Sequence, residues 1–155
     1  MYIPPTMTAV EFRRERPFLW MCILAVATKS ARKQQLLGAK IRRILADKLI
    51  VENERSIDAL LGLLAYMGWA NYHLGPIQPF LSMYCLLIAG LVQDLGLEKM
   101  PRRADDPQHP MACLKSTHVL VQRLALPVAR TMEERRAVIA AFIITSEYVF
   151  FNTIT

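Results

Sequence analysis

The chain has 155 residues, of which 54% are hydrophobic, and a formal net charge of +6. That length fits one domain with a real core, and the apolar content excludes a disordered tail. The excess positive charge lies in residues 1–55, which hold eleven Lys and Arg against five Asp and Glu, whereas residues 56–155 hold eight of each. A basic surface suits an anionic partner but does not define a fold.

The cysteines Cys22, Cys85 and Cys113 are too few and too scattered for the disulfide framework of a small secreted domain. Their largely apolar neighbours predict reduced, buried thiols in an intracellular protein. No CxxC pair is present to hold structural zinc.

Two helices are predicted before residue 30. Thr6 or Thr8 suits the N-cap of a short helix that runs into the arginine-rich residues 13–16. Pro17 suits the first turn of the next helix, because proline lacks the amide that an interior turn would use. Residues 18–28 are apolar on nearly every side and therefore predict a central, buried helix.

Residues 31–51 show the clearest amphipathic pattern and predict one helix. Its apolar positions, spaced three and four apart, are Leu37, Ile41, Ile44, Leu45 and Leu49. Much of the basic excess lies on its other side, at Arg32, Lys33, Lys40, Arg42, Arg43 and Lys48.

Two more helices follow a polar turn at residues 52–55. Ser56 is a good N-cap, and Asp58 lies in the first turn near the positive end of the helix dipole. We expect this helix to reach about residue 73, before Gly75 and Pro76. Pro79 then opens a helix that ends near residue 95, and Gly96 suits the left-handed position after it.

The last third contains a predicted loop at residues 97–110 and two further helices. The first runs from about residue 112 to residue 126, with an apolar side formed by Leu114, Val119 or Leu120, and Leu124. Pro127 stops or kinks it. Thr131 and Glu134 form a capping box, and the final helix should bury Val138, Phe142, and Thr145 or Ile144. The fold class is therefore all-α, an array of six or seven helices in a single domain, 1–155.

Two alternatives involve a membrane. Residues 59–93 contain no Asp, Glu, Lys or Arg and would suit a membrane hairpin. Each apolar stretch, however, is shorter than the roughly 20 residues of a span. Residues 13–27 resemble a signal peptide, although Glu11 and Glu15 disturb its basic region. A buried antiparallel helix pair explains residues 59–93 more simply, and we expect no membrane partner.

Residues 97–118 concentrate the side chains that bind metals or phosphate. The metal-ligand types are Asp105, Asp106, His109, Cys113 and His118, and the phosphate-binding types are Lys99, Arg102 and Arg103. The metal set lacks paired ligands at short spacing, and the basic set lacks a glycine-rich turn before a helix. We therefore predict a solvated connection here.

Other candidate residues also favour structural roles. His73 suits a helix end, and Arg135 and Arg136 suit an exposed first turn beside Glu133 and Glu134. Core positions are expected for Trp20, Tyr66, Met67, Trp69, Met83 and Tyr84, although such an apolar helical domain would also suit a small-molecule pocket. We predict no catalytic residue, no cofactor-binding residue and no metal ligand in this chain.

Four segments, in order, carry a likeness to a known family. They are RPFLWMCILAVATKS at 16–30, SIDALLGLLAYMGW at 56–69, LVQDLGL at 91–97 and TMEERRAVIAAF at 131–142. Together they resemble the helical middle regulatory region of fungal zinc binuclear cluster transcription factors, over roughly residues 11–150. The resemblance implies an all-α regulatory domain in the nucleus that acts through protein partners, through the remainder of a larger transcription factor, or through a small-molecule effector.

That family reads DNA with a module of six closely spaced cysteines around two zinc ions. Because this chain has three scattered cysteines, we expect zinc and DNA binding only through an N-terminal cluster missing from these residues. The resemblance therefore predicts a non-enzymatic fragment or truncated form of a transcription regulator. The rival predictions are a helical ligand- or partner-binding module unconnected with transcription and a membrane-associated helical protein.

Overall fold

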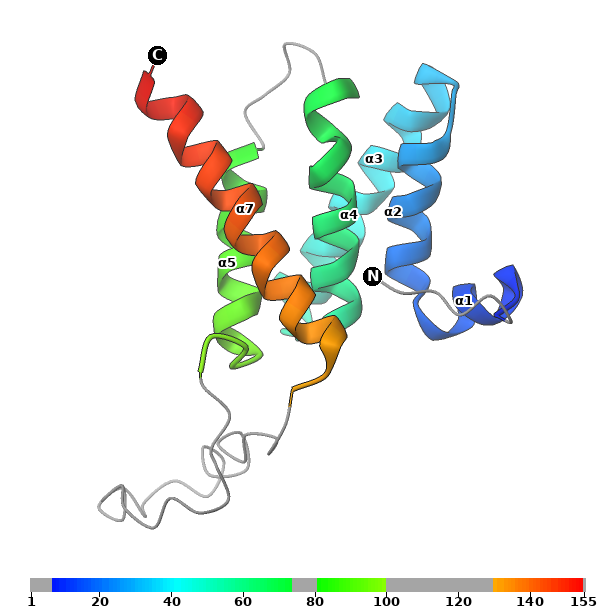
Figure 1. The fold of residues 1–155 in the computed structure, drawn as a ribbon. Coiled ribbons are helices and arrows are strands. Elements are labelled where there is room, and N and C mark those ends of the chain that lie inside the picture. Colours follow the sequence, from blue (N-terminus) through cyan, green and yellow to red (C-terminus); the bar gives the residue numbers. More distant parts are fainter. Residues whose placement is uncertain (1–6, 74–80, 100–129, 155) are drawn as a thin grey trace.

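The computed structural model describes residues 7–73, 81–99 and 130–154, and these form helices and short connections without a strand (Figure 1). The α-helices are α1 (Ala9–Glu15), α2 (Pro17–Ala27), α3 (Ala31–Leu45), α4 (Ile57–His73), α5 (Leu81–Asp94) and α7 (Met132–Ile154). A π-helix, η1 (Ala46–Val51), continues α3. The all-α prediction is confirmed.

Helix α4 is the centre of the array. It packs against α2 on one side and against α5 and α7 on the other, while α3 lies against α2 (Figure 1). Its core-facing side chains include Leu60 and Leu63, both with no exposed surface. An apolar helix needs neighbours on several sides because it has no polar face to turn to water. This explains why the charge-free sequence at 59–69 becomes the middle of the bundle.

Helix α2 packs directly against α4 at Gly62, which has no side chain. A Cβ built at Gly62 would stand 2.4 Å from Phe18 Cδ1 and 3.3 Å from Cys22 Sγ. Phe18 and Cys22 are buried at 4% and 0% exposure. The predicted burial of this helix is confirmed for Phe18, Leu19, Cys22 and Ala25, whereas Leu24 is exposed.

Helix α1 begins at a complete capping box. The Glu11 amide donates to the Thr8 hydroxyl at 3.3 Å, and the Thr8 amide donates to the Glu11 carboxylate at 2.8 Å. The bond from the Thr8 amide, followed by a bond of 2.9 Å from the Thr8 hydroxyl to the same carboxylate, lowers the pKa of Glu11. Phe12 of this helix contacts Trp20 of α2 edge to face, with ring centroids 5.9 Å apart. The sequence offered Thr6 or Thr8 as the N-cap of this helix, and the structure assigns that role to Thr8.

The helix predicted over residues 31–51 forms, with a change of geometry near its end. Ile41, Leu45 and Leu49 are buried as predicted, but residues 46–51 adopt π-helical hydrogen bonding. The helix ends where the Glu52 amide donates to the Asp47 carbonyl at 2.8 Å. Asn53 follows with φ of 53°, a left-handed conformation that asparagine tolerates better than most residues.

Helix α7 packs against α4 and α5 through small side chains, which corrects one sequence prediction. Ala137 and Ala141 are buried, and Val138 and Ile144 are half-buried at the edge of the same stripe. Phe142 is 71% exposed, so its predicted burial is wrong. It lies one residue beyond Ala141, and a step of about 100° around the helix turns it away from the core.

The aromatic and sulfur-containing side chains divide between core and surface. Tyr66, Met67 and Tyr84 are buried as predicted, and Trp20 is half-buried against the core. Trp69 and Met83 are 55% and 56% exposed, so their core assignment is wrong. The thiols of Cys22 and Cys85 are free and buried, as expected. Burial, followed by the charge of Asp58, raises the pKa of Cys22.

Several predictions lie outside the described residues. They include the loop beyond residue 99, the helix at 112–126, and the proline-rich stretch at 75–79 with Pro79 as helix opener. Within the described ranges, no helix combines the length and the hydropathy that a membrane span requires.

Gly62→Ala should destabilise the fold because the new methyl group would overlap the Phe18 ring. We expect the free energy of unfolding to fall by about 1–3 kcal/mol, the usual cost of overpacking. Gly68→Ala in the same helix is the matched control, since nothing lies within 4 Å of its added Cβ. It should stabilise the protein by about 0.5–1 kcal/mol. Urea unfolding measures both, and equal effects of the two variants would contradict this packing.

Candidate functional site

A set of charged side chains with hydrogen-bond partners on other segments gathers at one end of the bundle, where α2, α4 and α7 begin and α5 ends (Figure 1). We call this set the polar junction. Its members are Arg16, Arg55, Asp58, Asp94, Arg130 and Glu133. Three arginines thus balance three carboxylates, and they come from segments far apart in the sequence.

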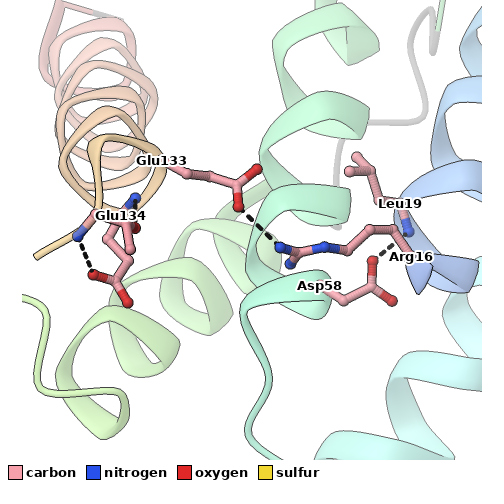
Figure 2. A network of polar contacts seen from close by, with 6 residues as sticks. Arg16, Leu19, Asp58, Glu133 and Glu134 are labelled. Atoms are coloured by element: carbon pink, nitrogen blue, oxygen red, sulfur yellow. Dashed lines mark hydrogen bonds and ion pairs between the residues drawn. The ribbon is translucent and has the colours of Figure 1, made fainter. Parts of the chain in front are cut away.

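Asp58 caps a helix other than its own. Its carboxylate accepts hydrogen bonds from two amides in the first turn of α2, that of Phe18 at 3.0 Å and that of Leu19 at 3.1 Å. Figure 2 shows the bond to Leu19. Helix α2 has no side-chain cap of its own, because Arg16 occupies its N-cap position and Pro17 follows. A carboxylate suits the positive end of a helix dipole. Asp58 therefore fixes the first turn of α4 against the first turn of α2.

Arg16 connects the start of α2 to the start of α7. Its guanidinium Nη2 lies 2.9 Å from Glu133 Oε2, and the two side chains are 27% and 31% exposed (Figure 2). Glu134 beside it completes the predicted capping box: the Thr131 amide donates to its carboxylate at 2.9 Å, and its own amide donates to the Thr131 hydroxyl at 3.2 Å. Glu133 therefore pairs with a distant arginine, whereas Glu134 in the same helical turn forms the local cap.

Arg55 and Arg130 complete the polar junction at the end of α5. Arg55 pairs with Asp94 through Nε and donates to the Leu49 carbonyl at 2.8 Å, which joins the end of η1 to the end of α5. Arg130 donates to the carbonyls of Gly96, at 2.9 Å, and Leu97. Cations are favourable at helix C-termini, where carbonyl groups lack helical partners.

The backbone conformation at position 96 explains why a glycine is present there. Its φ of 66° is left-handed, and the Leu97 amide donates to the Val92 carbonyl at 2.9 Å, as in a helix C-cap of the Schellman type. The prediction for Gly96 is confirmed. The left-handed residue also presents the carbonyls of residues 96 and 97 to Arg130.

The chemistry of the polar junction is that of a connection between helices. Its six members include no hydroxyl, thiol or imidazole, and each of its carboxylates accepts a hydrogen bond from a guanidinium or from backbone amides. Arginines remain charged under all ordinary conditions. The arrangement therefore orients four helix ends.

The structure describes one of the residues that the sequence offered as metal or phosphate candidates, Lys99. Asp105, Asp106, His109, Cys113, His118, Arg102 and Arg103 lie outside the described residues. Lys99 is exposed just beyond α5, and His73 is the last residue of α4. Across the ranges that the structure describes, no group of three or more His, Cys, Asp or Glu side chains comes together as a metal site would require.

Sequence reasoning recognised the local caps and missed the long-range partners. Ser56 accepts from the Ala59 amide at 3.3 Å, as predicted, but Asp58 was assigned only to the dipole of its own helix. Glu133 was assigned to an exposed turn. One signal was available: a buried helix that starts at Arg16-Pro17 has no local acceptor for its first amides, so an acceptor must come from elsewhere.

The chain is similar to proteins named as fungal transcription factors. It is 36% identical over 149 residues to transcription factor opdL of Penicillium oxalicum, covering 94% of this chain and 26% of that protein. It is 32% identical over 100 residues to transcription factor himD of Aspergillus japonicus, covering 64% of this chain and 16% of that protein. A transcription factor of Aspergillus terreus is 32% identical over 80 residues, 52% of this chain and 12% of that protein.

These relatives are much longer than the matched region, so the chain spans about a quarter of their length or less. No protein-family model matches the chain, and no solved structure matches it. The chain is thus homologous to part of proteins that are named as transcription factors in fungi, which agrees with the coarser part of the sequence resemblance.

Asp58→Ala should destabilise the protein by about 2 kcal/mol, since two amides of a buried helix lose a charged acceptor. Asp58→Asn keeps one acceptor oxygen and should cost less. Asp47→Ala is the control, because the Asp47 side chain is 60% exposed and its ion pair within the described residues is a long one, to Arg43 at 4.0 Å. Its effect should stay within about 0.5 kcal/mol. Urea midpoints measure the series, and equal loss in Asp58→Ala and Asp47→Ala would exclude the capping role.

The Arg16–Glu133 pair should show measurable coupling in a double-mutant cycle with alanine at both positions. At 27% and 31% exposure, solvent screening limits the expected coupling to about 0.5–1 kcal/mol. The Arg43–Asp47 pair, 87% and 60% exposed, is the matched control and should couple by about zero. A coupling energy of zero for Arg16–Glu133 would show that α2 and α7 are not joined through this pair.

Proposed function

We propose that this chain forms the helical regulatory region of a fungal zinc binuclear cluster transcription factor. The observation that carries the proposal is the match to transcription factor opdL, which extends over 149 residues at 36% identity. The match covers 94% of this chain. The chain would act as a regulator of transcription in the nucleus and not as an enzyme.

The polar junction supports the same proposal. The four segments that carry the family resemblance contribute Arg16, Asp58, Asp94 and Glu133, one from each segment. A likeness confined to apolar periodicity would fit many helical proteins. In this chain the same four segments also meet through polar contacts, and this supports the proposal that they belong to one regulatory unit.

We place DNA recognition and zinc outside this chain. A binuclear cluster of this family requires six closely spaced cysteines, and the chain has Cys22, Cys85 and Cys113. Cys22 and Cys85 are buried in the helical core, so they are unsuited to a zinc cluster. The helical region would then act on a separate DNA-binding module, through protein partners or through a small-molecule effector.

A tethering experiment tests this function. The full chain, fused to an unrelated DNA-binding domain, should raise or lower expression of a reporter relative to the DNA-binding domain alone. Asp58→Ala should weaken that effect because the helices would lose their junction, whereas Asp47→Ala should preserve it. Immunoblotting controls for the amount of each fusion protein.

Two results would contradict the proposal. A stable wild-type fusion that leaves the reporter unchanged would remove the regulatory role. Tight, site-specific DNA binding by the chain alone, measured by competition with unrelated duplexes, would contradict the assignment of DNA recognition to another module. Weak, salt-sensitive binding without sequence preference would reflect only the basic surface and is compatible with the proposal.

A further inference from the structure

The outer face of α3 is a basic surface with an apolar residue in its middle. From Lys29 to Arg43 the chain carries six cations and no carboxylate. These cations are exposed, and so is Leu36 at 65%. We call Arg32, Leu36, Lys40 and Arg43 the α3 face.

Helical geometry places these four side chains together. Arg32 and Lys40 lie four residues before and after Leu36, and Arg43 lies seven residues after it, so all of them share one side of the helix. The opposite side carries Ile41 and Leu45, which are buried at 0% and 4% exposure. The α3 face therefore points away from the core.

Little within the described part of the chain neutralises this face. Arg43 contacts Asp47 at 4.0 Å, but at 87% and 60% exposure the pair is screened by water. No ion pair is found for Arg32 or Lys40 among the described residues. Arg42 is left out of the face because it interacts within the molecule, close to Tyr84.

We propose that the α3 face binds an acidic amphipathic peptide helix. Carboxylates of the peptide would pair with Arg32, Lys40 and Arg43, and an apolar side chain of the peptide would cover Leu36. Charge complementarity selects an anionic partner and guides its approach. Leu36 selects a protein partner over a nucleic acid, because a phosphate backbone would satisfy the cations and leave this leucine in water.

Fluorescence anisotropy of a labelled synthetic helix, with glutamates on one side and leucines at helical spacing on the other, tests the proposal with the full chain. We expect saturable binding that weakens as salt rises, because the charges are exposed. Leu36→Ser should weaken binding about tenfold through loss of apolar contact. The double variant Arg32→Glu/Arg43→Glu should weaken it more than tenfold by like-charge repulsion.

Matched variants elsewhere control for general effects of the substitutions. Leu86→Ser changes a leucine on α5 that is 69% exposed, and Arg135→Glu/Arg136→Glu reverses two exposed arginines on α7. Both should bind the peptide as the wild type does. Circular dichroism confirms that each variant keeps its helices, so that a lost fold is not mistaken for a lost contact.

The remaining outcomes overturn the proposal. Absence of peptide binding at low salt would do so, as would equal weakening by Leu36→Ser and Leu86→Ser. Binding to a short DNA duplex or to phosphatidylserine vesicles that exceeds peptide binding, and that ignores Leu36→Ser, would assign the face to nucleic acid or to a lipid surface instead. Loss of reporter activity in the tethered fusion is a separate result, since the peptide measurement does not depend on a role in transcription.

Discussion

The arrangement depends first on the need to satisfy the amides at the buried start of α2. Phe18 and Leu19 are 4% and 1% exposed, so water is a poor partner for the first turn, and the helix has no cap of its own. Asp58 supplies both missing acceptors from the first turn of α4. Because one carboxylate serves two amides of another helix, the register and the relative position of α2 and α4 are fixed together.

The rest of the bundle follows from that fixed pair. Close contact between α2 and α4 is possible because Gly62 leaves room for the Phe18 ring. Arg16, next to the capped turn, reaches Glu133 and so positions α7, while Arg55 and Arg130 hold the end of α5. Segments separated by as many as 117 residues in sequence meet at one end of the molecule.

Most helices could be predicted from neighbouring residues in the sequence. The predictions that failed share one cause, because they depend on contacts between distant segments. Caps at Thr8, Ser56 and Thr131 and the left-handed Gly96 depend on neighbouring residues, so they could be predicted. The exposure of Phe142 could not be predicted in this way, because the face that α7 turns to the core is set by how closely its alanines approach α4 and α5. The partners of Asp58 and Glu133 likewise lie about 40 and 117 residues away. No periodicity encodes such pairings.

Hydrogen exchange of backbone amides, followed by NMR on the wild-type chain, tests the central role of the Asp58 cap most directly. The amides of Phe18 and Leu19 should exchange slowly, at a rate close to that of core amides such as Leu63. First-turn amides of α3, at Arg32 and Lys33, provide the internal comparison, because that helix has no side-chain cap and its first turn is exposed. They should exchange fast. Equal, rapid exchange at Phe18, Leu19, Arg32 and Lys33 would contradict the account.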